Sequence, residues 1–145
     1  MKNTKGFTLI ELLVVISIIG VLALMGLRVY GDQQKKAKNA IVIANSSTVH
    51  TLIQGDLLDN DYSTSEDDDD TSTSVIENIG GDADPATDLA NMKNPYAGTN
   101  IAKTGTIGTG NEGEVIVEWK SSNYFEIQGI GAGDLATGEV LIAKR

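Results

Sequence analysis

The chain has few of the residues on which redox, metal and catalytic chemistry depend. Its 145 residues include no cysteine, one histidine and two prolines, and aromatic residues make up 5%. The absence of cysteine excludes disulfide bonds and thiol chemistry. The single histidine, His50, has no second ligand at metal-binding spacing, so we expect a structural role for it. Only Phe7 and Tyr30 among the aromatic residues precede residue 59, which argues against a stacked, electron-conducting path there.

No motif for binding phosphate or for nucleophilic catalysis is recognisable. The glycine-rich segment 105–113 follows threonine and precedes a predicted strand, whereas a phosphate-binding loop leads into a helix. No nucleophile elbow is present either. The formal net charge is −9, and an acidic surface repels nucleic-acid phosphates. We therefore expect no enzyme, no nucleic-acid binding and no cofactor, apart from the calcium alternative considered below.

One long apolar run dominates the beginning of the chain. Residues 7–27 are interrupted only by Thr8, Glu11, Ser17 and two glycines. As an α-helix, about 21 residues at ~1.5 Å each span roughly 31 Å. The hydrocarbon layer of a bilayer is roughly 30 Å thick. We therefore predict a membrane-spanning helix over 7–27.

The flanks of this run and the acid inside it constrain its role. Lys2 and Lys5 precede the run and favour a cytoplasmic start, although four further cations follow it at 28–38. A carboxylate such as Glu11 costs about 2.5–3.5 kcal/mol at mid-membrane on insertion scales. The sequence offers Glu11 no cation within its own helix, so we expect its partner to come from a neighbouring copy.

The residues around this acid resemble a known processing signal. Residues 5–16, KGFTLIELLVVI, resemble the prepilin signature of type IV pilins and type II secretion pseudopilins. The resemblance implies that a prepilin peptidase in the membrane cuts after Gly6 and N-methylates Phe7, the new first residue. It also implies that Glu11 pairs with the terminal amine of an adjacent subunit. The implied partners are further copies of the chain, the peptidase, and the pilus assembly platform with its ATPase.

The positions of the charges are consistent with that implied pairing. A terminal amine at Phe7 lies about one helical turn from Glu11, so a copy shifted along the axis can match the two charges. At 4 Å such a pair is worth about 4 kcal/mol at an effective dielectric of 20. The chain departs from the family pattern at Arg28, where many members have proline. Gly20 and Gly26 each cost a helix roughly 1 kcal/mol relative to alanine, so any unwinding of the stem is expected between them.

The helical pattern continues to about Leu58. At about 100° per residue, bulky apolar residues fall on one side and small residues on a neighbouring strip. The bulky side consists of Ile41, Val42, Val49, Leu52, Ile53 and Leu57. The small-residue strip consists of Ala37, Ala40, Ala44, Thr48, Thr51 and Gly55. We expect the chain's own sheet to cover the bulky side, while the strip either lets another helix approach closely or merely fills the helix surface.

An acidic and polar segment follows at 59–90. Its run of acids at 66–70, flanked by serine and threonine, predicts a solvated loop. The residues at positions 1, 3, 5 and 12 of an EF-hand-like count are Asp59, Asp61, Ser63 and Asp70. In this count, threonine stands at position six in place of the turn glycine, and aspartate stands at position 12 in place of glutamate. A calcium site is therefore the weaker alternative.

Turns and short strands are predicted for the rest of the chain. Residues 94–98, Asn-Pro-Tyr-Ala-Gly, form a turn cluster that resembles the Asn-Pro-aromatic turn of many Gram-positive pilins. Residues 114–119 and 124–128 read as an antiparallel hairpin, and 139–143 as a third strand. The pattern predicts an α+β fold of the lollipop type found in pilins. In it, a long N-terminal helix, half transmembrane and half amphipathic, packs on a small antiparallel sheet.

The sequence therefore predicts a leader at 1–6, a stem helix at 7–58 and a small head at 59–145. We expect a structural subunit of a type IV pilus-like filament, serving adhesion or surface motility. It would be a single-pass membrane protein before assembly and extracellular afterwards. One alternative is a pseudopilin of type II secretion or DNA uptake, but only Asp134 and Glu139 are available for the C-terminal acidic loop of the major pseudopilin. A monomeric, membrane-anchored calcium-binding domain is the other alternative.

Overall fold

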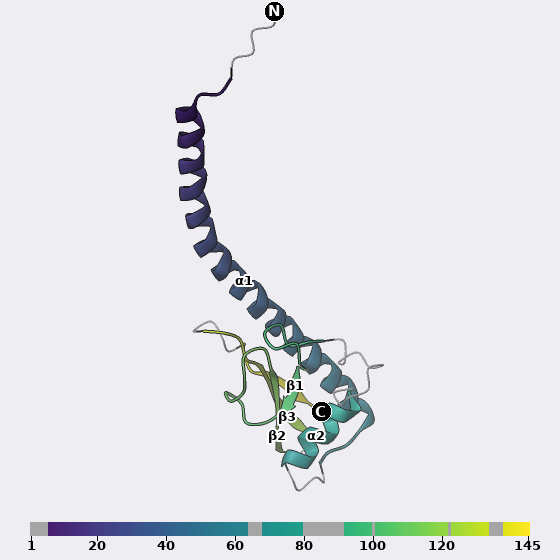
Figure 1. Ribbon diagram of the computed structural model, residues 1–145. Helices are drawn as coiled ribbons and strands as arrows, with labels where there is room; N and C mark the ends of the chain where they lie inside the picture. The colour runs from purple at the N-terminus through teal and green to yellow at the C-terminus, as the bar shows by residue number, and fades with distance from the viewer. Residues whose placement is uncertain (1–5, 64–67, 80–91, 100, 122, 134–137) are drawn as a thin grey trace, which may run out of the picture. The chain divides into compact units, whose positions relative to one another are not determined.

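The computed structural model of the chain describes residues 6–63, 68–79, 92–99, 101–121, 123–133 and 138–145. The elements within these residues are α1 (Leu9–Asp59), α2 (Asp68–Asn78), β1 (Ala102–Thr104), β2 (Val115–Ser121), β3 (Tyr124–Gly129) and β4 (Leu141–Lys144) (Figure 1). The chain divides into two compact units, residues 1–36 and 37–145, and α1 contributes to both.

In the first unit, α1 is a helix without a buried side chain. Every residue from Leu9 to Lys36 is exposed. The large apolar side chains of 9–27 retain between 48% (Val15) and 82% (Leu9) of their accessible surface. By length and composition α1 can cross a membrane. The helix is continuous through Gly20 and Gly26, and their unwinding in a filament stays a prediction.

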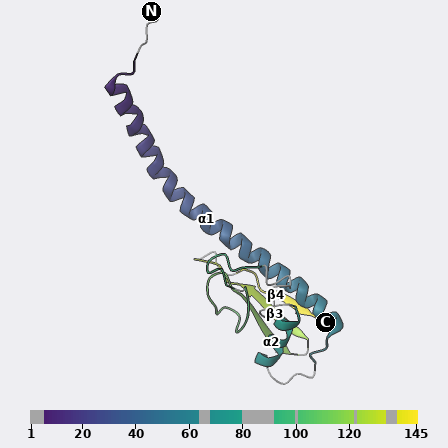
Figure 2. The ribbon, with the colours of Figure 1, turned by 45° about the vertical axis from the view of Figure 1, so that its right-hand side comes forward.

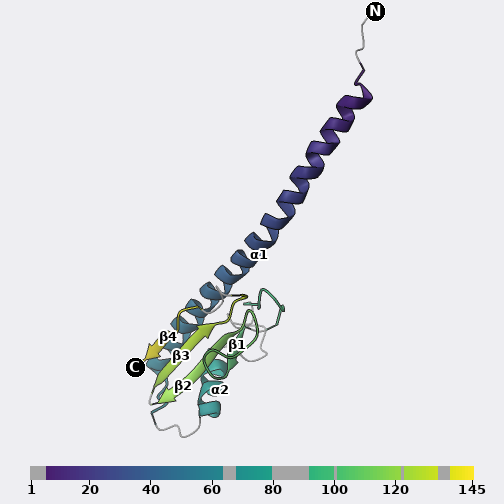
Figure 3. The same ribbon diagram turned by 90° about the vertical axis from the view of Figure 1, so that its left-hand side faces the viewer.

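The second unit is built on a four-stranded sheet in the order β1-β2-β3-β4 (Figure 3). β2 and β3 form an antiparallel hairpin in which Val117 lies opposite Ile127. β4 pairs antiparallel with the other edge of β3. The hairpin agrees with the strands predicted at 114–119 and 124–128, and β4 begins two residues after the predicted start of the third strand.

The prediction of a purely antiparallel sheet is wrong at β1. This strand runs parallel to β2, with Ala102 opposite Val115. A tight turn can join only antiparallel neighbours, whereas parallel neighbours need a longer connection. Residues 105–114 provide that connection, which returns the chain to the start of β2. The α+β fold class itself is confirmed.

The hydrophobic core lies between the sheet and the two helices. α1 supplies Val49, Ile53 and Leu57, and α2 supplies Val75 and Ile76. The strands supply Val115, Val117, Phe125, Ile127 and Ala143. Because side chains alternate along a strand, these residues share one face of the sheet. Figure 2 shows β3 and β4 beside α1, and the His50 Nε2 of α1 lies 2.8 Å from the Ile142 carbonyl of β4.

The covered side of α1 differs in part from the predicted one. Val42, Val49, Ile53 and Leu57 are at most 1% exposed, but Ile41 is 47% exposed. The buried stripe instead passes through three polar residues, Asn39, Asn45 and Ser46. Hydropathy could not identify these three because their burial depends on hydrogen-bond partners elsewhere in the fold. The six residues of the small-residue strip are all exposed, and their packing against another helix stays a prediction.

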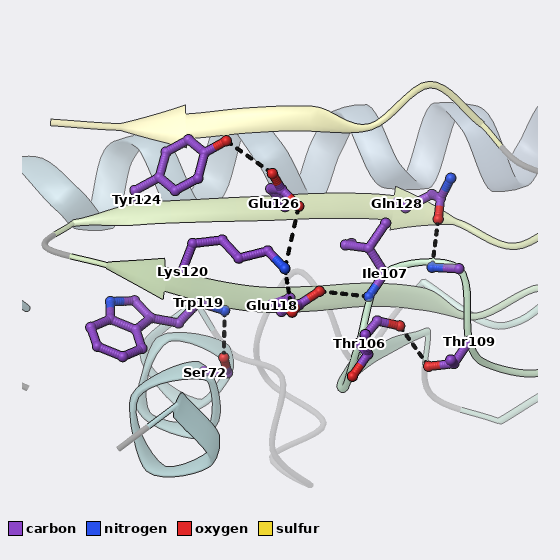
Figure 4. Close-up of polar contacts among 11 residues, drawn as sticks. Ser72, Thr106, Ile107, Thr109, Glu118, Trp119, Lys120, Tyr124, Glu126 and Gln128 are labelled. Atoms are coloured by element: carbon purple, nitrogen blue, oxygen red, sulfur yellow. Dashed lines mark hydrogen bonds and ion pairs between the residues drawn. The ribbon is translucent and has the colours of Figure 1, made fainter. Parts of the chain in front are cut away.

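The prediction of a loop throughout 59–90 is wrong for residues 68–78. These residues form α2, which packs Val75 and Ile76 into the core. Ser72 Oγ also accepts the Trp119 backbone N–H of β2 at 3.0 Å (Figure 4). Glu66, Asp67 and residues 80–90 lie outside the described residues.

Candidate functional site

The predicted cleavage site lies just before the first turn of α1. Gly6, Phe7 and Thr8 are not helical, and all three are exposed; Phe7 retains 86% of its surface. A Cβ atom added to Gly6 would meet no other atom within 4 Å. Among the described residues, no contact therefore requires glycine at position 6.

Glu11 has a hydrogen-bond partner in its own chain that the sequence analysis did not identify, Thr8, which lies just before the first residue of α1. The Thr8 backbone N–H and the Thr8 hydroxyl both donate to Glu11 Oε2, at 2.8 and 2.7 Å. The Glu11 N–H in turn lies 3.4 Å from Thr8 Oγ1. This reciprocal arrangement is a capping box, which satisfies N–H groups at the start of a helix. The Thr-x-x-Glu spacing of residues 8–11 is the sequence signal of this capping box.

The capping box uses only one of the two carboxylate oxygens. Both donors from Thr8 reach Glu11 Oε2, and within the described residues no hydrogen bond reaches Oε1. A carboxylate has about four acceptor positions on its two oxygens. Glu11 can therefore close its own helix and still accept a hydrogen bond or an ammonium group from outside the chain.

Two polar side chains join α1 to loops of the second unit. The Tyr96 hydroxyl donates to Asn39 Oδ1 at 2.6 Å. Asn39 also pairs with the backbone of Ala132, donating to its carbonyl at 3.1 Å and accepting from its N–H at 2.9 Å. The Lys38 ammonium lies 4.9 Å from the centre of the Tyr96 ring, within range of a cation–π interaction. These contacts fix the Asn-Pro-Tyr turn and the loop after β3 to α1.

The Asn-Pro-Tyr turn depends on one buried side chain. Asn94 Oδ1 accepts the backbone N–H groups of Tyr96 and Ala97 at 2.7 and 3.1 Å. Asn94 Nδ2 donates to the Glu112 carbonyl at 2.9 Å. Gly113, with φ of +89°, lies directly against this side chain. The turn predicted at 94–98 is therefore confirmed, and the side chain of its first residue holds it in place.

The outer face of the sheet carries a row of charged and polar groups (Figure 4). Glu118 Oε2 accepts the Ile107 N–H at 2.7 Å, and Gln128 Oε1 accepts the Gly108 N–H at 2.9 Å. The Lys120 ammonium contacts the carboxylates of Glu118 and Glu126. Partial burial raises the pKa of Glu118, but the Ile107 N–H and Lys120 outweigh it, so the net shift is downward. Glu118 and Gln128 thus hold the glycine-rich connection against the sheet.

Among the residues of the calcium alternative, Asp61 already has hydrogen-bond partners. Asp61 Oδ1 accepts Asn123 Nδ2 and the Ser63 N–H at 2.8 and 2.9 Å. The hydrogen bond from Asn123 and the bonds from Ser63 lower the pKa of Asp61 to about 2. Asp59 is the last residue of α1, and Asp70 lies in α2 with its side chain outside the described ones. Among the described residues, no group of three or more acidic or histidine side chains is arranged to hold a metal ion.

Comparisons with known proteins support the same N-terminal signal. Residues 1–27 match the family described as "Prokaryotic N-terminal methylation motif". These residues carry the methylation motif of type IV pilins and pseudopilins. The chain is 39% identical over 59 residues to Fimbrial protein Q of Moraxella bovis, a match that covers 41% of the chain and 38% of the relative. It is 43% identical over 54 residues to Fimbrial protein EcpB of Eikenella corrodens, covering 37% and 34%.

A third relative gives a match of the same extent. A fimbrial protein of Pseudomonas aeruginosa is 36% identical over 59 residues, covering 41% of the chain and 38% of the relative. The chain thus spans little more than a third of the length of these relatives. No solved structure matches the chain. The methylation motif is therefore a finding, whereas the activity of the whole protein is a proposal.

Proposed function

We propose that this chain is a non-enzymatic structural subunit of a type IV pilus-like surface filament. The observation that carries the proposal is the apolar helical surface of 9–27. Every residue of this surface is exposed in the single chain, and the surface lies within residues 1–27, which match the methylation motif. An exposed apolar surface of this length needs a bilayer or other helices around it. A membrane precursor that later polymerises meets both requirements in turn.

The proposed pathway begins in the cytoplasmic membrane. The precursor spans the membrane once, through 7–27, with residues 1–6 on the cytoplasmic side. Prepilin peptidase cuts after Gly6 and methylates the amine of Phe7. The assembly platform and its ATPase then extract the subunit into a filament on the cell surface. The exposed, non-helical Gly6 and Phe7 support this pathway, because a peptidase needs accessible and extended backbone.

In the filament, we propose that Glu11 accepts the methylated amine of Phe7 from a neighbouring copy. The unoccupied Oε1 supports this role, because the capping box leaves it available. Burying the pair among apolar stems strengthens its attraction and penalises an unpaired charge. The pair would thereby set the axial register of the copies.

The proposal is tested by shearing cells and examining the released material. We expect filaments composed of this chain, visible by negative stain. Gly6→Arg should leave the full-length precursor in the membrane fraction, because a large side chain would not fit the cleavage pocket of the peptidase. Normal filaments from Gly6→Arg would contradict the proposed processing. A correctly cut chain that forms no surface filament would favour a pseudopilin.

A further inference from the structure

A glycine-rich segment crosses the outer face of the sheet. Residues 105–113, here named the strap, connect β1 to β2. Backbone hydrogen bonds hold both ends, because the Gly105 N–H donates to the Val117 carbonyl and the Gly113 N–H donates to the Ile130 carbonyl. Four of the nine residues are glycine, which gives the backbone between the ends an unusual freedom to change conformation.

The strap covers an apolar side chain that the sheet alone leaves open. Val115 and Val117 point into the core, so Ile116 between them points to the outer face, because side chains alternate along a strand. Ile116 is nevertheless only 1% exposed. Cβ atoms added to Gly105 and Gly110 would lie 3.6 and 2.9 Å from carbons of its side chain. The backbone of the strap therefore lies directly on Ile116.

Two side chains of the sheet hold the middle of the strap. Glu118 Oε2 accepts the Ile107 N–H at 2.7 Å, and Gln128 Oε1 accepts the Gly108 N–H at 2.9 Å (Figure 4). An ionised carboxylate is a stronger acceptor than a neutral group. One of these two hydrogen bonds therefore weakens when its acceptor takes up a proton, whereas the acceptor of the other does not titrate.

The charges around Glu118 favour its ionised form only in part. Glu118 lies directly opposite Glu126, and the Lys120 ammonium contacts both carboxylates. The Tyr124 hydroxyl donates to the other oxygen of Glu126, Oε1, at 2.9 Å. Among the described residues of this face, a single cation thus compensates two facing acids, and like charges directly opposite each other destabilise a sheet.

A second acid holds the strap near its end. Glu114 accepts the backbone N–H of Asn111 at 2.8 Å and its side-chain amide at 3.0 Å. Partial burial raises the pKa of Glu114, but the hydrogen bonds from Asn111 and the charge of Lys103 outweigh it, so the net shift is downward. Glu112, the acid of the strap itself, is exposed. Since the pKa values of Glu114 and Glu118 both lie below the ordinary 4.5, their ionised forms favour the closed strap, and this contribution is lost as the pH falls through the lowered values.

We propose that the strap is an acid-released cover of the outer face of the sheet. At neutral pH, the ionised carboxylates of Glu114 and Glu118 hold it closed over Ile116. Below about pH 4 they take up protons, and the strap opens as one segment between its end glycines and bares Ile116. The core on the other face of the sheet stays folded. This device concerns the head alone, and it operates whether or not the chain polymerises.

Amide hydrogen exchange of the full chain in detergent, followed by NMR, tests the proposal. The Ile107 and Gly108 amides report on the strap, and the amides of the β2–β3 ladder report on the sheet. We expect the protection of both strap amides to fall by about threefold or more between pH 6 and pH 3, while the ladder keeps its protection. Gly108 is decisive, because its acceptor Gln128 does not titrate. Unchanged protection, loss at Ile107 alone, or simultaneous loss in strap and ladder would each overturn the proposal.

A pair of matched variants separates the strap from the general charge of this face. Glu118→Gln and Glu126→Gln each remove one of the two facing acids, but only Glu118 binds the strap. With Glu118→Gln, the strap amides should exchange about threefold faster than wild type already at pH 6, because the charged acceptor is gone. Glu126→Gln should keep the pH dependence of the wild type. Identical behaviour of the two variants would refute the proposal, and if Glu118→Gln does not fold, the exchange profile of the wild type decides alone.

Discussion

At the scale of single residues, Glu11 combines two tasks that substitutions can separate. Its Oε2 closes the first turn of α1 with Thr8, and its charge is proposed to receive the amine of a neighbouring copy. The first task needs only an acceptor, whereas the second needs a negative charge. Alanine removes both, and glutamine removes only the charge.

We therefore predict that Glu11→Gln behaves like Glu11→Ala in assembly. Both should insert into the membrane at least as well as the wild type, because the buried charge is gone, and both should lose at least tenfold in filament yield. Thr8→Ala keeps the charge and loses only the cap, at about 0.5–2 kcal/mol, so it should retain most filaments. Blots of membrane and sheared fractions measure these yields. Normal filaments from Glu11→Gln would show that capping, and not the charge, is what assembly requires.

Asp61 predicts a dependence of stability on pH. Asn123 is the main cause of its lowered pKa of about 2 in the folded chain. Because this folded pKa lies below the ordinary aspartate pKa of 3.8, the ionised carboxylate stabilises the fold above about pH 4. This contribution is lost as the pH falls through 2. Asp61→Asn should thus lower the melting temperature at pH 6 but not near pH 2, followed by Trp119 fluorescence in detergent. An equal loss at both pH values would contradict this.

At the scale of elements, the Asn-Pro-Tyr turn and the connection before β2 support each other. Asn94 is buried, and Gly113 approaches it so closely that a Cβ atom would lie 1.9 Å from Asn94 Oδ1. Gly113 also has a φ of +89°. A side chain at this position would displace Asn94 and leave the Tyr96 and Ala97 N–H groups without their acceptor.

Gly113→Ala should consequently destabilise the head by about 3 kcal/mol, from backbone strain together with the lost Asn94 contacts. Gly108→Ala is the matched control, because Gly108 has a similar φ of +85° but open space around its Cα. Strain alone should cost it about 1 kcal/mol. Denaturant unfolding of both variants measures the difference. If the two substitutions cost the same, the Asn94 contact contributes nothing to stability.

The sequence predicted those elements whose pattern is local. Apolar residues interleaved with acids in 114–119, followed by 124–128, identified the hairpin, and the continuing helical pattern identified α1. It did not reveal α2, because Val75 and Ile76 are its main core residues among serine, threonine and acids. The sequence also did not reveal that β1 pairs in parallel with β2. The direction of this pairing depends on contacts between residues that are distant in the chain. The Thr-x-x-Glu spacing of the capping box is present in the sequence, but the charge of Glu11 led to the prediction of a cation as its partner.

At the scale of the whole molecule, the proposed processing changes the net charge of each subunit. Removal of 1–6 takes Lys2 and Lys5 away and leaves nine basic against 20 acidic residues. It also creates a terminal cation at Phe7. The side chains of the mature subunit are then more acidic overall, and its new terminal cation lies at Phe7, where the proposed pair with Glu11 of another copy forms.

The N-terminal residue of assembled subunits tests this account most directly. Sheared filaments are purified, and the N-terminal peptide of the subunit is identified by mass spectrometry. We predict a chain that begins at Phe7, carries one methyl group on its amine and lacks residues 1–6. Filaments whose subunits retain Met1 would contradict the account, because an uncut leader leaves no Phe7 amine for Glu11 to receive.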